Sequence, residues 1–394
     1  MLWLLQILSL ALVALASPPS YHGGGAYFYK GHDLSSLPIL VEGGAIYKDG
    51  QHGNITKCAE DILGAGGMNT VRLRIWVNPP DGNYNLEYNI KFASQLVKKG
   101  YKIYLDFHFS DTWADPQHQL VPVAWLDPAT NTTTVAALEV KIREYVADTL
   151  LAFHKAGIKL DLVSLGNEIR HGTLWPYAQA DVDREPFSSV IANFTNLAHI
   201  YASARRGVTD AVSKGAEKPT VMIHIDNGWN LTLQERWFGA ITAEGIVTTK
   251  DWDVFGFSFY PFYGAAATFD NLYHSLHTLA AKYHKPIMVV ETDFPATGCT
   301  GGVYQNETFP AFFSEPELVP LGVQGQLDWM AEITKIVRSL PNGLGQGTFY
   351  WEPAWLNSTS LGGACPDSLL FDQDWSDLAH PVGISRKSVE MFRH

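Results

Sequence analysis

Leu162-Val163-Ser164-Leu165-Gly166-Asn167-Glu168 is an apolar, strand-like run that ends in a glutamate, and Pro286-Ile287-Met288-Val289-Val290-Glu291-Thr292 repeats the pattern. Runs this apolar are typical of parallel strands that are buried on both faces. In α/β barrels, side chains at the C-terminal ends of such strands line the place where the chemistry occurs. The two runs therefore predict a parallel α/β fold with a pair of carboxylates at one end.

The chain around these runs alternates between strand-like and helix-like segments, in eight successive units. Strands are expected at 25–30, 70–77, 102–109, 160–168, 220–226, 254–260, 287–291 and 347–352. Helices are expected at 55–63, 90–99, 135–155, 187–213, 271–283, 323–339 and 385–392. Eight such units predict one domain over residues 17–394, a closed (β/α)8 TIM barrel with elaborated βα loops. Glu168 and Glu291 would then end the fourth and seventh strands and face each other across the barrel mouth.

Residues 1–16 form a segment of a different kind. They are apolar and end in Ala14-Leu15-Ala16, the small-x-small pattern of a signal-peptide cleavage site. The run is too short to span a membrane, and no later stretch is long and apolar enough to do so. Six N-x-[ST] sequons support export, at Asn54, Asn131, Asn193, Asn230, Asn306 and Asn357. We expect a soluble, secreted, extracellular glycoprotein.

The chain has three cysteines. Cys58 falls in a helical pattern, whereas Cys299 and Cys365 lie in glycine-rich loops. An oxidising compartment permits a Cys299–Cys365 disulfide with Cys58 as a buried free thiol, and other pairings stay open.

The composition excludes some classes of function. The formal net charge is −12 and the basic residues are scattered, whereas nucleic-acid binding requires clustered Lys and Arg. Gly64-Ala65-Gly66-Gly67 closes a helix instead of opening one, so it does not predict a phosphate loop. Aromatic residues make up 12% of the chain, which fits a large core together with a cleft where sugars stack. No cofactor, nucleic-acid partner or membrane partner is expected.

Two carboxylates facing each other at a barrel mouth indicate glycoside hydrolysis. A retaining glycosidase needs two carboxyl groups about 5 Å apart, one protonated and one ionised. Glu168 follows Asn167, whose amide can hydrogen-bond a sugar hydroxyl, so Glu168 is the expected acid/base and Glu291 the expected nucleophile. The alternative is that either glutamate is a paired structural charge.

Polar and aromatic residues end the other predicted strands. Arg72 and Arg74 alternate onto the same side of their strand. Arg74, nearer the mouth, is expected to hold the nucleophile ionised, whereas Arg72 is more typical of a charge that fills the barrel interior. Further contacts to sugar or to the catalytic carboxylates are expected from His108, His224, Asp226, Tyr260 and Trp351.

Aromatic residues also occur in the loops that follow these strands, at Trp113, Trp229, Trp355 and Tyr263. Their rings can stack on the C–H face of a pyranose, or they can simply anchor the loops.

The same residue types could instead bind a metal. His108 with Glu168 or His224 would suit zinc or iron, but the chain has no H-E-x-x-H, no paired CxxC and no EF-hand spacing. Paired glutamates without closely spaced histidines favour a site without metal.

Three blocks carry a resemblance to a known family. They are Tyr29-Lys30-Gly31-His32-Asp33-Leu34-Ser35, Asn69-Thr70-Val71-Arg72-Leu73-Arg74-Ile75-Trp76-Val77-Asn78-Pro79 and Asp106-Phe107-His108-Phe109-Ser110-Asp111-Thr112-Trp113-Ala114-Asp115-Pro116. From about Tyr27 onward, the chain resembles glycoside hydrolase family 53, the arabinogalactan endo-β-1,4-galactanases. Members of that family usually carry Ala where this chain has His32.

The resemblance implies endo-hydrolysis of β-1,4-galactan, a side chain of pectin, with retention of configuration. It implies Glu168 as proton donor, Glu291 as nucleophile, and a Cys299–Cys365 disulfide where bacterial members bind calcium. The partner is then a polysaccharide, and a monomer is the expected state. Alternatives are a related endo-β-1,4-mannanase, xylanase or glucanase, or a non-catalytic carbohydrate-binding barrel.

Overall fold

Eight parallel strands close into a barrel in the computed structural model, which describes residues 27–297, 319–356 and 367–393. Strand β1 pairs with β12 on one side and with β4 on the other, and these two pairings close the sheet. Around the barrel the strands are β1 (Tyr29–Asp33), β4 (Thr70–Ile75), β5 (Lys102–Phe107), β6 (Leu162–Leu165), β9 (Thr220–Ile225), β10 (Val254–Ser258), β11 (Ile287–Glu291) and β12 (Gly345–Tyr350). The predicted TIM barrel is confirmed.

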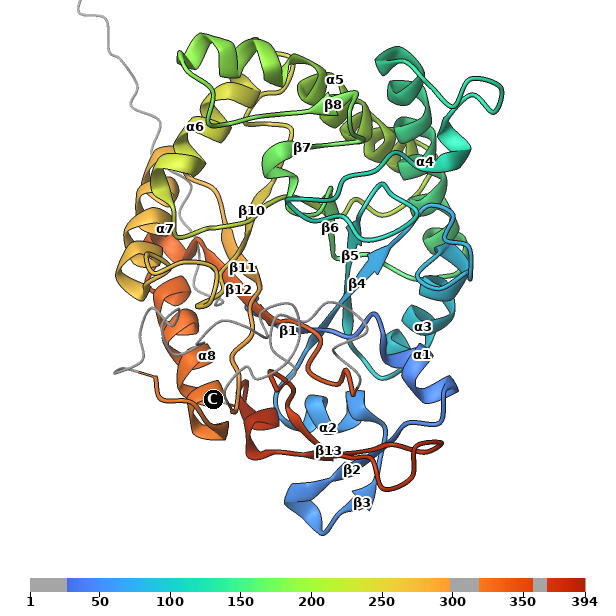
Figure 1. Cartoon of the computed structure of the whole chain (residues 1–394), viewed down its shortest axis with the longest axis vertical. Helices are drawn as coiled ribbons and strands as arrows, with labels where there is room; N and C mark the ends of the chain where they lie inside the picture. Colours follow the sequence, from blue (N-terminus) through green and yellow to red (C-terminus); the bar gives the residue numbers. More distant parts are fainter. Residues whose placement is uncertain (1–26, 298–318, 357–366, 394) are drawn as a thin grey trace, which may run out of the picture.

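Helices surround the barrel as an outer ring (Figure 1). They are α1 (Leu37–Glu42), α2 (Ala59–Ala65), α3 (Leu86–Lys98), α4 (Val135–Lys155), α5 (Phe187–Ser213), α6 (Leu231–Thr242), α7 (Phe269–Tyr283) and α8 (Val323–Arg338). The predicted bounds of α4 and α5 are confirmed at both ends. Helix α6 was not predicted, although Leu233, Trp237 and Ile241 recur at helical spacing and are buried. No helix in the described ranges is long and apolar enough to cross a membrane.

The predicted helix at 385–392 is wrong. Ser385 ends strand β14 (Val382–Ser385), and only the short 3-10 turn η7 (Lys387–Glu390) follows it. Strand β14 lies between β13 (Phe371–Asp374) and β2 (Ile46–Asp49) in a small sheet beside the barrel. Apolar residues at the end of the chain therefore pack on this sheet and on the barrel.

The expected helix at 55–63 begins later than predicted. Ile55–Thr56 is strand β3, which pairs with β2, and Cys58 is the residue that precedes α2. The Cys58 side chain is exposed, which corrects the expectation of a buried free thiol. It lies outside the helix because its backbone is extended, with φ −63° and ψ 141°.

The barrel interior is filled by large side chains from alternate strand positions. Phe349 packs edge-on against Tyr104, with ring centroids 5.4 Å apart. Gly31 on β1 faces the same Phe349 ring, and any Cβ at this position would overlap it. The remaining residues of this inner core are Leu162, Met222, Val254, Met288 and Val290. The barrel is therefore a packed core with its functional groups confined to one end.

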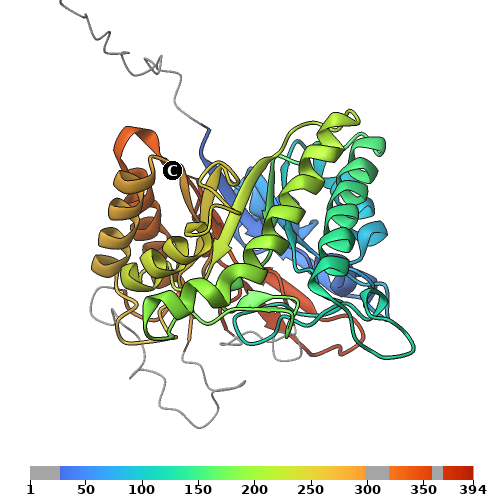
Figure 2. The ribbon, with the colours of Figure 1, turned by 90° about the horizontal axis from the view of Figure 1, so that it is seen from above.

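Long βα loops project from the C-terminal ends of the strands (Figure 2). The loop after β6 contains the 3-10 turn η3 (Ile169–His171) and the two-stranded hairpin of β7 (Gly172–Thr173) and β8 (Ala178–Gln179). The predicted elaborated loops are thus present at the end of the barrel where both glutamates lie.

Candidate active site

Glu168 lies three residues beyond the end of β6, where the chain turns sharply into η3. Its backbone is left-handed, with φ 46° and ψ 49°, and Gly166 just before it has φ 109°. A glutamate in this region of backbone space is strained, and such residues persist where the surrounding structure fixes them. Glu168 is only 8% exposed. The turn thus holds a carboxyl group at the barrel mouth and out of bulk water.

Glu291 is aimed by a β-bulge. Phe257 on β10 pairs with Val289 and Ser258 pairs with Glu291, so Val290 is an extra residue in β11. Strict alternation would place Val290 and Glu291 on opposite faces, but a bulge re-aims the side chain that follows it. Val290 packs in the barrel interior, and Glu291 also reaches the groups at the mouth.

Glu168 and Glu291 approach each other closely. One carboxylate oxygen from each, together with a ring nitrogen of His224, all lie within 4.8 Å of one another. Retaining glycosidases hold their two carboxyl groups about 5–5.5 Å apart, whereas inverting enzymes leave about 6.5–9.5 Å for a water molecule. The spacing suits direct attack by one carboxylate on the sugar.

Both oxygens of Glu291 are held by protein groups. The Tyr260 hydroxyl donates to Oε1 at 2.8 Å, and Arg72 Nη2 lies 3.0 Å from Oε2. Burial raises the pKa of Glu291, while Arg72 and the Tyr260 hydrogen bond both lower it. These two partners stabilise the ionised form of Glu291.

Arg72, and not Arg74, holds Glu291, which corrects the expectation from sequence. The Arg72 guanidinium also reaches Asp33 Oδ2 at 2.9 Å, Asp106 Oδ2 at 2.8 Å and the Asn167 amide oxygen at 2.8 Å. Arg72, on β4, therefore links β1, β5, β11 and the turn after β6 beneath the mouth. The coulombic attraction of Arg72 keeps the pKa of Asp106 below its usual range despite burial.

Arg74 binds a different carboxylate, Glu352, in the loop after β12. Its Nη1 donates to Glu352 Oε1 at 2.6 Å, and Nη2 donates to Ser36 Oγ at 2.5 Å. The Trp113 ring covers the Arg74 guanidinium at 4.3 Å from the ring centroid. Arg74 thus supports the rim of the mouth and does not contact Glu291.

The surroundings of Glu168 differ from those of Glu291, because they favour the protonated carboxyl group. Burial is the largest cause that raises the pKa of Glu168 well above its ordinary value, and the charges of Glu291 and Asp226 raise it further. No arginine or lysine forms an ion pair with Glu168 among the described residues. Burial thus raises the pKa of both carboxyl groups, but only Glu291 has a cation and a hydroxyl donor that stabilise its ionised form, so Glu168 is the better proton donor.

Asp226 directly follows strand β9 and lies near Glu168. Arg170 Nε, in the turn η3, lies 3.3 Å from Asp226 Oδ2, and Asn227 donates to the same oxygen at 3.0 Å. Oδ1 of Asp226 is buried and has no hydrogen-bond partner within the described part of the chain. Burial raises the pKa of Asp226 to about 7, against the opposing effect of Arg170.

The other predicted strand-end residues are held by protein contacts. The Asn167 amide donates to the Ala114 carbonyl at 2.7 Å, so both ends of its side chain are fixed. His108 Nδ1 accepts from the Ala114 N–H at 3.0 Å and from Trp76, and its ring does not reach a glutamate of the mouth. His224 Nε2 lies 2.9 Å from Ser258 Oγ, and burial lowers the pKa of His224 to about 3. His224 is therefore a neutral imidazole next to both glutamates.

The loop aromatics divide into exposed and buried rings. Trp113, Trp229 and Trp351 are half-buried, and Tyr263 is 50% exposed. Trp229 Nε1 donates to Asn227 Oδ1 at 3.2 Å. Trp355 is fully buried and stacks on Trp113 with ring centroids 6.1 Å apart, so it supports the Trp113 ring and does not itself face the cleft.

Glu168, His224 and Glu291 also offer the donors that a transition metal accepts. A metal would have to displace Arg72 or Tyr260, because each already occupies one oxygen of Glu291. The donor set therefore fits a paired-carboxylate site better than a metal centre.

Sequence reasoning missed several members of the site. Asp33, Asp106, Ser258 and Glu352 carry buried charges or hydroxyls that touch the arginines or His224. All lie at or just beyond the ends of barrel strands, so their positions were available as a signal. The sequence could not indicate which residues they contact, because the height of each side chain within the barrel depends on the register between strands.

Some predicted sites lie outside the described residues, namely the leader 1–16, Cys299, Cys365, Asn306 and Asn357. Of the other sequons, Asn54 and Asn131 are exposed. Asn193 and Asn230 are half-buried, and their side-chain oxygens accept from Asp181 N–H and Leu233 N–H.

Comparison with known proteins adds an independent finding. The family model described as "Glycosyl hydrolase family 53" matches residues 29–380. An arabinogalactan endo-β-1,4-galactanase of Humicola insolens is 40% identical over 366 residues, covering 92% of this chain and 98% of that protein. A probable arabinogalactan endo-β-1,4-galactanase A of Aspergillus fumigatus is 39% identical, covering 95% and 94%.

Solved structures of the same family superimpose on this chain. A structure from a study of two fungal β-1,4-galactanases superimposes with a TM-score of 0.79 at 37% identity, covering 93% of this chain and 99% of that one. A family 53 catalytic domain from Ignisphaera aggregans superimposes with a TM-score of 0.75 at 24% identity, covering 93% and 95%, which supports the fold.

Proposed function

This chain belongs to glycosyl hydrolase family 53, and from that premise we propose that it hydrolyses internal β-1,4 linkages of galactan with retention of configuration. The observation that carries the mechanism is the pair of carboxyl groups with oxygens within 4.8 Å of each other. Arg72 and Tyr260 bind only one of the pair, which gives the two groups different roles.

In the first step, Glu291 is the nucleophile. Its carboxylate attacks the anomeric carbon, the bond to the leaving-group oxygen breaks, and Glu168 donates its proton to that oxygen. In the second step, the ionised Glu168 takes a proton from water, and the water oxygen displaces Glu291 from the anomeric carbon. Two inversions give net retention. Arg72 and Tyr260 stabilise the ionised form of Glu291, and burial favours the protonated form of Glu168 at the start.

Support for the surrounding residues comes from their positions. Asn167 precedes Glu168, and His224, Asp226 and Tyr260 lie near the carboxyl pair, while the half-buried tryptophans lie in βα loops at the same end of the barrel. We assign them to binding of the sugar ring and its neighbours, with Trp113, Trp229 and Trp351 as stacking surfaces. Arg74 and His108 support this surface from behind.

The deciding experiment offers β-1,4-galactan, β-1,4-mannan, xylan and β-1,4-glucan to the purified protein in parallel. We expect internal cleavage of galactan, measured as a rapid fall in polymer length, with β-anomeric products by proton NMR at early times. Activity confined to another polymer would reject the galactan assignment. Binding without cleavage of any of them would favour a non-catalytic barrel.

Two variants test the roles of the glutamates. Glu291→Ala should lose at least about 10³-fold in kcat, and azide should restore some turnover with a product of inverted configuration. Glu168→Gln should lose as much on galactan but far less on an aryl galactoside whose leaving group needs no proton. Equal loss on both substrates would contradict the role of Glu168 as proton donor.

We also propose secretion, with cleavage after Ala16, a mature single domain from residue 17, a Cys299–Cys365 disulfide and a monomeric enzyme. Glycans are expected first at the exposed Asn54 and Asn131. N-terminal sequencing, non-reducing peptide mapping and light scattering of protein from a eukaryotic culture medium test these four statements.

A further inference from the structure

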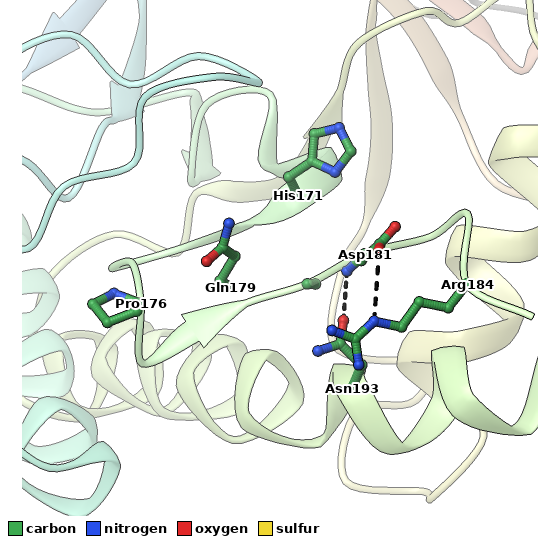
Figure 3. A pocket seen from close by; sticks show the side chains of 7 residues that line it. His171, Pro176, Gln179, Asp181, Arg184 and Asn193 are labelled. Atoms are coloured by element: carbon green, nitrogen blue, oxygen red, sulfur yellow. Dashed lines mark hydrogen bonds and ion pairs between the residues drawn. The ribbon is translucent and has the colours of Figure 1, made fainter.

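A polar hollow lies beside the loop that carries Glu168. It is open to solvent and has a volume of about 560 Å³, within the range of carbohydrate-sized and drug-sized sites. Figure 3 shows the side chains that line it, which come from η3, the β7–β8 hairpin, the segment between β8 and α5, and the start of α5. Among the lining residues are His171, Pro176, Gln179, Asp181, Arg184 and Asn193.

The hollow is joined to the active site by the chain itself. Glu168 precedes η3, Arg170 of η3 pairs with Asp226 at the mouth, and His171 at the end of η3 is part of the hollow's wall. A general acid protonates the leaving-group oxygen, so the segment that follows it borders the side where the leaving part of the polymer emerges. The hollow and Glu168 therefore belong to one continuous segment, the loop after β6.

The chemistry of the lining suits neutral sugars. Amide, carboxylate, guanidinium and imidazole groups offer both donors and acceptors to hydroxyls. Burial and the nearby Arg170 charge lower the pKa of His171, so its imidazole is neutral. The Arg184 charge is balanced by Asp181, with Nε 3.5 Å from Oδ2. Such a surface binds hydroxyls without selecting a charged ligand.

Hydrogen bonds within the protein fix the backbone that lines the hollow. Asn193 Oδ1 accepts from the Asp181 N–H at 2.5 Å, and the His171 carbonyl accepts from the Ala180 N–H at 2.8 Å. Arg236 donates to the Val182 and Arg184 carbonyls at 3.1 and 2.8 Å. Fixed groups lose little conformational freedom on binding, which favours a real subsite over a passive surface depression.

We propose that this hollow is a distal binding site for the leaving-group side of the polysaccharide, beyond the sugars held at the catalytic glutamates. The proposal depends on the proposed glycosidase function. A second source of the same chemistry is the protein's own glycan, because Asn193 is a sequon. We assign the site to the substrate, since the Asn193 side chain is half-buried and bonded into the wall.

The test compares long β-1,4-galactan with galactotetraose, which under this proposal does not occupy the catalytic site and the distal site at once. Gln179 and Arg184 are exposed, so Gln179→Ala/Arg184→Ala should fold normally. This double variant should lose about threefold to tenfold in kcat/KM on the polymer, as expected for one or two lost hydrogen bonds, and nothing on the tetramer. The matched control is Gln324→Ala/Arg206→Ala, which changes an exposed Gln on α8 and an exposed Arg about 20 Å along α5 from Asn193.

Each outcome separates the proposals. Equal loss on both substrates, or no loss on the polymer, overturns the distal site. Peptide mass spectrometry that finds a glycan on Asn193 in most molecules also overturns it, because that glycan would fill the hollow. Absence of wild-type activity on both galactan substrates would instead reject the proposed function.

Discussion

Arg72 contacts acceptors on β1, β5 and β11 and in the turn after β6. The planar shape of its guanidinium therefore matters as much as its charge. Arg72→Lys keeps the charge, but an ammonium group cannot present a planar fork to several carboxylates at once. We expect kcat to fall about 10²-fold, the size of losing one preorganised donor. The acidic limb of the pH profile should also move to higher pH, because Arg72 lowers the pKa of Glu291.

Arg74→Lys is the control for this change, since Arg74 is equally buried but binds Glu352 and Ser36. Its effect on kcat should be smaller and its acidic limb unmoved. The same shift of the limb in both variants would contradict the assignment of Arg72 to Glu291.

Tyr260 provides a second test at the level of one atom. Tyr260→Phe removes only the hydroxyl that donates to Glu291 Oε1, a hydrogen bond that lowers the pKa of Glu291. A higher pKa of Glu291 means that the enzyme must be taken to higher pH before its nucleophile ionises. The acidic limb of kcat/KM should therefore move up, with kcat lowered about tenfold. Tyr101→Phe, which loses a hydroxyl that donates to the Glu60 carbonyl at 2.8 Å, away from Arg72 and Glu291, should leave that limb in place.

The residues allowed in a barrel strand are limited by the side chains of the neighbouring strands. Strand β1 carries glycine at position 31 because the Phe349 ring of β12 occupies the space of a side chain. Gly31→Ala should destabilise the fold by about 1–3 kcal/mol through overpacking, measured by urea denaturation. Gly239→Ala in helix α6 is the matched control. Its Cβ would meet only the exposed Phe187 ring at 3.3 Å, so it should be neutral or slightly stabilising. Similar losses in both would indicate a general intolerance of added methyl groups.

The pH dependence of stability is a property of the whole molecule, and buried histidines contribute to it. His32 packs against the Phe392 ring at 5.0 Å, and neither ring nitrogen has a partner among the described residues. Burial lowers the pKa of His32 to about 3, below the ordinary value of about 6.5 in the unfolded chain. The unfolded state therefore binds a proton that the folded state rejects, and stability falls as the pH drops below about 6.5.

His32→Leu should remove this contribution. Between pH 7 and pH 4.5, the variant should lose roughly 2–3 kcal/mol less unfolding free energy than the parent, because one titrating group is gone. His224, with a similarly lowered pKa, is present in both proteins and cancels in the comparison. Parallel stability curves for the two proteins would show that His32 finds a proton-accepting partner in the folded state.

The sequence by itself determined the barrel, the order of its eight strands and the two glutamates at its mouth, but it missed helix α6 and wrongly predicted a helix at 385–392. These follow from local patterns, because apolar runs, helical spacing and strand ends are properties of short segments. The three family-like blocks determined the enzyme class in the same way.

Only the tertiary structure decided how the groups at the mouth are paired. Alternation placed Arg72 and Arg74 on one face but could not tell that Arg72 reaches Glu291. The bulge at Val290 that aims Glu291 exists only relative to the register of β10. Likewise, Trp355 in the loop after β12 is buried against Trp113 in the loop after β5. Each of these contacts joins residues distant in sequence, so no local pattern encodes it, and closure of the sheet fixes it.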